Sequence, residues 1–66
     1  MTDLVLDLPI WEDCPFKVPP HIEARGDTAH DRVVFWHAGK GKNVAIRRDG
    51  LTQYDVDLAI DLLEAI

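Results

Sequence analysis

Serine is absent from the 66 residues, and cysteine occurs only once. The first absence excludes a serine nucleophile, so His30-Asp31 has no hydroxyl partner with which to build a hydrolase triad. The second excludes an internal disulfide as a source of stability. A chain this short also rarely forms the concave pocket that catalysis needs, and we therefore predict that it is not an enzyme.

Long apolar runs are missing as well. No segment approaches the roughly 18 apolar residues that a membrane span requires. Near the N-terminus, Asp3 and Asp7 stand where an export signal would carry Lys or Arg. These features predict a cytoplasmic protein without a membrane partner.

The composition of the chain predicts a single small domain that spans residues 1–66. Hydrophobic residues make up 47% of the chain, which is enough for a core and too many for a disordered segment. The net charge of −5 is unevenly spread: residues 25–48 carry six bases and two acids, whereas residues 49–66 carry five acids and no base. Such a chain can neutralise itself by folding, or it can present two faces of opposite sign.

Hydrophobic patterning predicts an α+β fold with an antiparallel sheet of three or four strands. In residues 3–10 apolar side chains alternate with period two, which predicts a strand. Pro9 has no N–H to donate, so this strand should lie at a sheet edge. The alternative is an extended arm that docks on the sheet without full pairing. Residues 32–38 and 43–48 are rich in β-branched and aromatic side chains and give the strongest strand signal. Residues 21–25 are an optional further strand.

The two strongest strands should form a hairpin that turns tightly at Lys40-Gly41. This turn places Phe35 opposite Ile46 on one face and Trp36 opposite Ala45 on the other. The face with Phe35 is the more apolar, so the helix is expected to cover it. The proline-rich residues before the hairpin cannot form a regular element, and their apolar members should pin a loop to the core: Trp11, Phe16 and Val18.

Residues 52–66 are predicted to form one C-terminal helix that packs on one face of the sheet. Its start carries a capping box, with Thr52 at the N-cap and Asp55 three residues later. Leu51 and Val56 flank this box and form a hydrophobic staple across the helix start.

The apolar residues of this helix cover an arc of roughly 220°, about twice what one sheet face buries. The surplus flank consists of Leu58, Leu62 and Ala65. Together with Trp36 on the other sheet face, this flank predicts self-association as a homodimer. The competing cover is the N-terminal arm, which could satisfy the same flank within one chain.

Asp57, Asp61 and Glu64 share the remaining face of the helix as an acidic stripe. The stripe leads us to a non-catalytic protein–protein interaction module whose partner is a basic or nucleic-acid-binding protein. Compact acidic proteins of this size are often encoded by phages and mobile elements, so one form of the hypothesis is an inhibitor or regulator that occupies a basic surface of a host machine. The first alternative is a homodimeric structural domain whose stripe is merely solvated.

A second alternative is nucleic-acid or anion binding through a basic hairpin. The residues that would make this contact are Lys40, Lys42, Arg47 and Arg48. The acidic pI of about 4.8 argues against direct nucleic-acid contact. Gly39-Lys40-Gly41-Lys42 is also not a phosphate loop, because Lys42 is followed by Asn43 and a strand where such a loop needs Ser or Thr and a helix.

Four residues can in principle ligate zinc: Cys14, His21, His30 and His37. Their spacing matches no zinc finger or ribbon, so we predict no metal site and no cofactor. Cys14 lies beside Glu12 and Asp13, which disfavour a reactive thiolate, and is expected to be a small buried hydrophobe.

Overall fold

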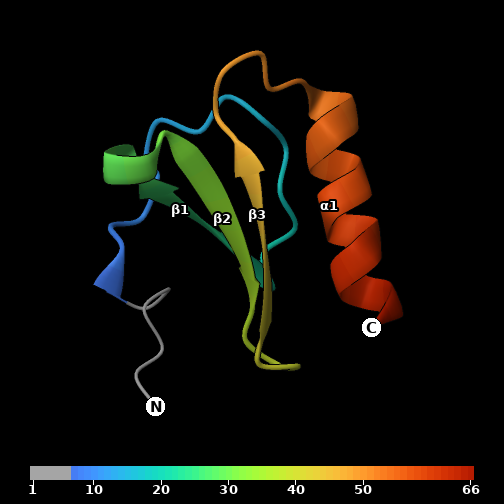
Figure 1. The fold of residues 1–66 in the computed structure, drawn as a ribbon. Coiled ribbons are helices and arrows are strands. Elements are labelled where there is room, and N and C mark those ends of the chain that lie inside the picture. Colours follow the sequence, from blue (N-terminus) through green and yellow to red (C-terminus); the bar gives the residue numbers. More distant parts are fainter. Residues whose placement is uncertain (1–6) are drawn as a thin grey trace.

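The computed structural model describes residues 7–66, which form a three-stranded antiparallel sheet with one helix on one of its faces (Figure 1). The strands β1 (Ile22–Asp27), β2 (Arg32–His37) and β3 (Lys42–Arg47) lie in the spatial order β1-β2-β3. A short 3-10 helix, η2 (Thr28–His30), joins β1 to β2, and α1 (Gln53–Ala65) follows β3. The predicted α+β class with a C-terminal helix is confirmed, and the optional strand is present as β1.

The predicted strand over residues 3–10 lies partly outside the described residues, and the described part is not a strand. Ile10 alone forms a bridge, to Arg25 on β1. Next to this bridge, the Gly26 N–H donates to the Pro9 carbonyl at 3.0 Å. Because Pro9 has no N–H, it can serve the β1 edge only as an acceptor. The described segment is therefore the docked arm of the two predicted alternatives.

The hairpin of β2 and β3 keeps the predicted faces but not the predicted register. Phe35 lies opposite Val44 instead of Ile46, a shift of two residues. A two-residue turn of the type I′ kind would require a positive φ at both Lys40 and Gly41. The loop instead spans residues 38–41, and within it only Gly41 has a positive φ, of 64°. Since side chains alternate with period two, a shift of two leaves every residue on its predicted face.

The start of α1 is built as predicted. Thr52 has extended backbone, and its hydroxyl oxygen accepts from the Asp55 N–H at 3.3 Å. The Asp55 carboxylate accepts in return from the Thr52 N–H at 3.2 Å, which completes the capping box. Leu51 is half-buried against the core and Val56 is fully buried. Gly50 turns the chain into this start with a φ of 73°, a left-handed conformation that favours glycine.

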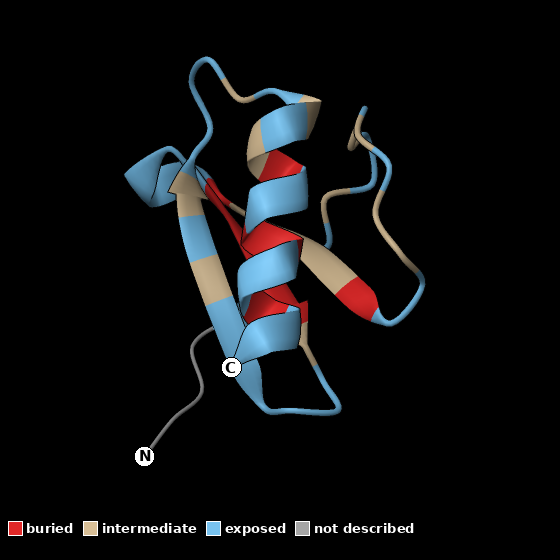
Figure 2. Ribbon diagram, turned by 90° about the vertical axis from the view of Figure 1, so that its right-hand side faces the viewer, coloured by how far each residue is buried: buried red, intermediate tan, exposed pale blue. Residues whose placement is uncertain are grey.

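The core lies between α1 and the sheet. Figure 2 looks onto α1 from outside and shows exposed residues on its outer surface, with buried residues where its turns meet the sheet. The buried core residues are Ile22, Val33, Phe35, Val56, Ala59, Ile60 and Leu63. As predicted, Trp11, Phe16 and Val18 of the proline-rich segment pack against this cluster.

On the opposite face of the sheet, β2 is covered where we expected it to be open, whereas Ala45 on β3 is exposed. Val34 and Trp36 are only 3% and 9% exposed, and Leu8 of the N-terminal segment packs against them. The prediction that Trp36 offers an exposed surface for self-association is therefore wrong. The physical reason is that the N-terminal segment turns Leu8 onto this face, whereas we placed the arm's competing role on the helix flank.

Candidate functional site

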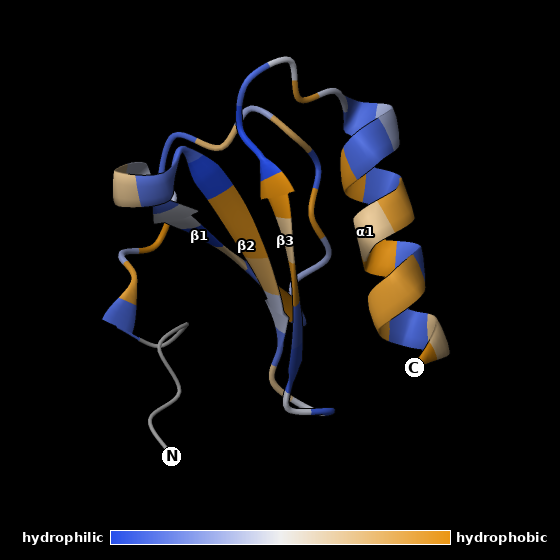
Figure 3. Ribbon diagram, viewed as in Figure 1, coloured by the Kyte–Doolittle hydropathy of each residue, from blue (hydrophilic) through white to orange (hydrophobic). Residues whose placement is uncertain are grey.

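The outward surface of α1 carries large apolar side chains that the described chain leaves exposed. Tyr54, Leu58 and Leu62 are 71%, 46% and 55% exposed, and their spacing of four residues places them in one row along the helix. Ala65 and Ile66 are exposed at the end of this row. Figure 3 shows hydrophobic colour continuing around the C-terminal half of α1, beyond the side that faces the sheet. We call these five residues the apolar row.

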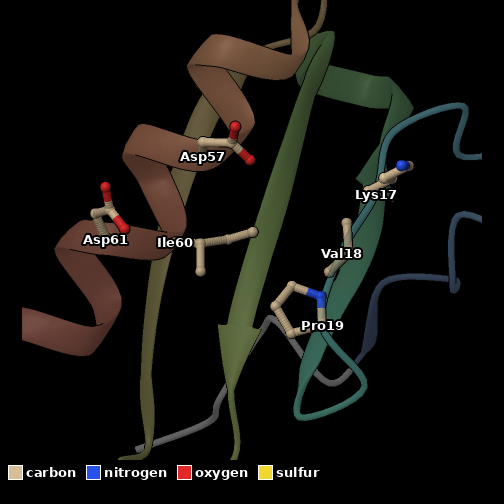
Figure 4. Close-up of a pocket in the computed structure, with 6 residues that line it drawn as sticks. All are labelled: Lys17, Val18, Pro19, Asp57, Ile60 and Asp61. Atoms are coloured by element: carbon tan, nitrogen blue, oxygen red, sulfur yellow. The ribbon is translucent and has the colours of Figure 1, made fainter.

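Two of the three predicted acidic residues, Asp57 and Asp61, lie beside the apolar row. Both are exposed, and they border a hollow of about 610 Å³ between α1 and the proline-rich loop (Figure 4). Ile60 points from α1 towards the loop, where Val18 and Pro19 form the other wall. The hollow thus combines apolar walls with the carboxylates of Asp57 and Asp61 at its helical rim and Lys17 on the loop side.

Gln53 holds the helix and the loop together at one end of this hollow. Its side-chain oxygen accepts from the Lys17 N–H at 2.8 Å, and its amide nitrogen donates to the Lys17 carbonyl at 3.1 Å. The same amide nitrogen lies 3.0 Å from a carboxylate oxygen of Asp57, to which it also donates. These contacts fix both walls, so the hollow is formed before any partner arrives.

Glu64, the third predicted acidic residue, does not belong with the other two. One of its carboxylate oxygens lies 2.6 Å from Nε2 of His21 and 3.5 Å from Nε2 of His37. The hydrogen bond with His21 lowers the pKa of Glu64. Partial burial opposes this change, and the charges of His21, His37 and Lys40 assist it, so that the pKa lies below its ordinary value. The predicted stripe is therefore divided into an open pair and a paired third residue.

The basic residues of the hairpin do not form a common patch. Lys40 donates from Nζ to the carbonyl oxygens of Glu64 and Ile66, at the negative end of the helix dipole. Arg48 stacks over the Trp11 ring, 5.4 Å from its centroid. Lys42 and Arg47 are exposed at opposite ends of β3 and, from the alternation of a strand, point to opposite faces. The four basic residues are therefore close in the sequence but dispersed in the structure.

A buried carboxylate on the far side of the sheet was missed by the sequence reasoning. Asp27 has a side chain only 8% exposed, and it accepts hydrogen bonds from Nε of Arg32 at 2.9 Å and from Nδ1 of His30 at 2.9 Å. Burial alone raises the pKa of Asp27, but the hydrogen bonds and charges of Arg32 and His30 outweigh it and lower the pKa. His30 and Arg32 follow Asp27 by three and five residues, and this short spacing was the available signal in the sequence.

The four residues considered for zinc are not gathered in one place as a set. Cys14 is half-buried rather than buried as predicted, and its thiol lies 3.7 Å from the Phe16 carbonyl oxygen. His30 pairs with Asp27, away from the two other histidines. His21 and His37, by contrast, lie together beside Glu64, a grouping that no spacing rule indicates.

Comparison with protein-family models, with curated proteins and with solved structures finds no match. Among the described residues, no helix has both the length and the apolar character needed to cross a membrane.

Proposed function

We propose that this chain is a non-catalytic protein–protein interaction module that docks through the outward surface of α1 onto a basic protein surface. The observation that carries the proposal is the apolar row lying directly beside the carboxylates of Asp57 and Asp61. Exposed apolar side chains rimmed by polar groups are typical of protein contact sites. Apolar contact would supply affinity, and the carboxylates would select a partner of positive charge.

A protein partner fits this surface better than a nucleic acid does. Asp57 and Asp61 would repel phosphate groups, and the apolar row beside them offers no favourable contact with a charged phosphate backbone. The bases that could bind phosphate are dispersed, with Lys40 and Arg48 already engaged by the helix end and by Trp11. Direct nucleic-acid binding through the hairpin is therefore the less favoured alternative.

The mechanism would be occupation of the partner's surface. A basic surface that accepts Asp57 and Asp61 is of the kind that other proteins use for nucleic acid, so docking there would inhibit or regulate the partner. An inhibitor from a phage or mobile element is the form of this proposal that we favour. We place the interaction in the cytoplasm, since small secreted domains generally rely on disulfides and this chain has one cysteine.

Charge reversal tests the proposal. Asp57→Lys with Asp61→Lys should abolish capture of the partner from a lysate, because both carboxylates would become repulsive to a basic surface. The matched control is Asp13→Lys with Asp49→Lys, which makes the same change in net charge at exposed residues outside the apolar row and the hollow. Loss of the same protein with the first variant and retention with the second supports the proposal, and retention with both contradicts it.

A second copy of the chain is the other candidate occupant of the apolar row, and the exposure of Leu58 and Leu62 favours it. In such a homodimer the two helices would pack against each other through the apolar row. Light scattering decides the question: a mass near 7.5 kDa means a monomer, and twice that mass means a dimer. In a dimer, Leu62→Glu should restore the monomer by placing a charge in the contact.

A further inference from the structure

Three side chains from distant parts of the chain meet under the C-terminal end of α1. They are His21 in the turn before β1, His37 at the end of β2 and Glu64 in the last turn of α1. Each offers one ligand atom, and these three atoms all lie within 4.8 Å of one another. The two imidazole rings are 5.2 Å apart with an interplanar angle of 66°, so they approach Glu64 from different directions.

We propose that His21, His37 and Glu64 form a binding site for a divalent transition-metal ion, with Zn²⁺ as the reference ion. Two imidazole nitrogens and one carboxylate oxygen are a donor set that zinc accepts, and they differ from the all-oxygen sets preferred by Mg²⁺ and Ca²⁺. Three protein ligands leave one tetrahedral position for water or for a group from a partner.

The distances fit this assignment once the side chains of His21 and Glu64 rotate to new positions. Bonds of about 2.0–2.1 Å in tetrahedral geometry hold neighbouring ligand atoms about 3.3 Å apart. The separation between His37 and Glu64 is already 3.5 Å, whereas the hydrogen bond between His21 and Glu64 is 2.6 Å and must open. The side chains of His21 and Glu64 are 50% and 47% exposed, so this opening requires only side-chain rotation at the surface.

The third ligand, His37, is held in place. Its side chain is only 13% exposed, and a Cβ on Gly39 would lie 3.2 Å from its Cε1, so glycine at that position leaves room for the ring. The Lys40 N–H lies 3.3 Å from Nδ1 of His37. A metal at Nε2 would move the ring proton to Nδ1 and end that contact, but the same N–H also donates to the His37 carbonyl at 3.2 Å.

The surrounding charges are compatible with a cation. Glu64 supplies a carboxylate, whose ordinary pKa lies well below neutral pH, and the carbonyl end of α1 adds partial negative charge. Lys40 opposes the ion, but its ammonium group is directed to the carbonyl oxygens of Glu64 and Ile66. A bound ion would join the loop before β1, the end of β2 and the end of α1, and would stabilise the folded state because only that state presents all three ligands.

Titration of the untagged full chain with Zn²⁺ alone, in competition with a chromophoric chelator, tests this proposal. We expect one ion per chain and a rise in melting temperature that a chelator reverses. His21→Asn and Glu64→Gln should each weaken binding about tenfold or more, since even second-shell changes alter metal affinity by about 10- to 100-fold. His30→Asn is the matched control, because His30 is an exposed histidine at another site.

Two results of the titration would overturn the proposal. One is wild-type affinity no greater than that of the two ligand variants. The other is an equal loss on His30→Asn, which would mean that zinc binds surface histidines without preference. Circular dichroism of each variant shows whether it is folded, and the visible absorption of the Co²⁺ form provides a second reading. A tetrahedral Co²⁺ spectrum in the wild type that disappears in Glu64→Gln supports the site, and an octahedral spectrum in both contradicts it.

Discussion

The two ends of α1 are held by different means. At the N-terminal end, the side chains of Thr52 and Asp55 each accept a hydrogen bond from the other residue's backbone N–H, across three residues. At the C-terminal end, Glu64 is bound by His21, which lies 43 residues away, and by Lys40, which lies 24 residues away. The first device is contained within the helix sequence, whereas the second exists only after the sheet, the loop and the helix have come together.

This difference separates two contributions to stability. A capping box stabilises the helical conformation itself, because its partners are neighbours in the chain. The contacts of Glu64 depend on docking and add nothing to an isolated helix. A variant at the N-terminal end should therefore lower helix formation, while a variant at the C-terminal end should affect only the docked state.

Phe35→Ala removes a core contact between the sheet and α1, on which both ends of the helix depend, and should have the largest effect on stability. Phe35 is fully buried under α1, and this truncation costs about 3–5 kcal/mol. A core of this size supplies about 3–5 kcal/mol in total, so we expect the variant to be largely unfolded by circular dichroism at room temperature. Tyr54→Ala is the control, because Tyr54 is 71% exposed and its loss should leave stability nearly unchanged. A cooperative urea transition close to that of the wild type would contradict the core assignment.

Asp27→Asn tests whether burial or separation in the sequence determines how much a charged contact contributes to stability. Asp27 is close in sequence to its partners, like the capping box, but it is buried. Its lowered pKa means that the stability it contributes is complete above about pH 4 and is lost as the pH falls through the folded-state value. We expect Asp27→Asn to be less stable than the wild type near pH 6, with the difference narrowing in acid.

Urea unfolding of both proteins at about pH 6 and about pH 3 measures this effect. Asp31→Asn is the control, because Asp31 is exposed and asparagine tolerates its φ of 51°. A stability difference that stays constant over this range would mean that the carboxylate of Asp27 contributes no charge-dependent stability.

The sequence was informative where the deciding residues are close together. The capping box at Thr52, the strand around Phe35 and the burial of Phe35 beneath α1 all follow from short-range patterns. The hairpin register was predicted wrongly because the pattern of apolar residues is unchanged by a shift of two, and only the φ requirement of Lys40 distinguishes the two registers.

The parts of the candidate site that depend on distant segments could not be predicted. The burial of Trp36 depends on Leu8, which arrives from the N-terminal segment. The division of the acidic residues depends on His21 and His37, which helical periodicity cannot place. Three members of the apolar row, Leu58, Leu62 and Ala65, were predicted as the surplus flank, because this needs only the helix and the knowledge of which face is buried. Tyr54 and Ile66 were not predicted as part of it.

Thr52→Ala tests the local end of the helix. The substitution removes the oxygen that accepts from the Asp55 N–H and should cost about 1 kcal/mol in the free energy of unfolding. The hydroxyl also donates to the Asp55 carboxylate at 3.0 Å, but it carries no net charge, so the loss should depend on salt less than the loss of an ion pair does. Thr52→Ser keeps the oxygen and is the control. A melting temperature of Thr52→Ala that equals the wild-type value would remove the capping assignment.

Glu64→Gln tests the distant end and should have the smallest effect. Its side chain is 47% exposed, and half-exposed ion pairs contribute little to stability, so we expect a smaller loss than with Thr52→Ala. The loss should also shrink at about 1 M salt, where charges are screened within about 3 Å. A chelator is kept in the buffer so that no metal ion contributes. Asp61→Asn is the control on the same helix, and it should be neutral or slightly stabilising because it removes repulsion from Asp57. An equal loss of stability at both salt concentrations would mean that Glu64 contributes by packing and not by charge. The two ends of α1 would then differ only in the sequence separation of the residues in contact.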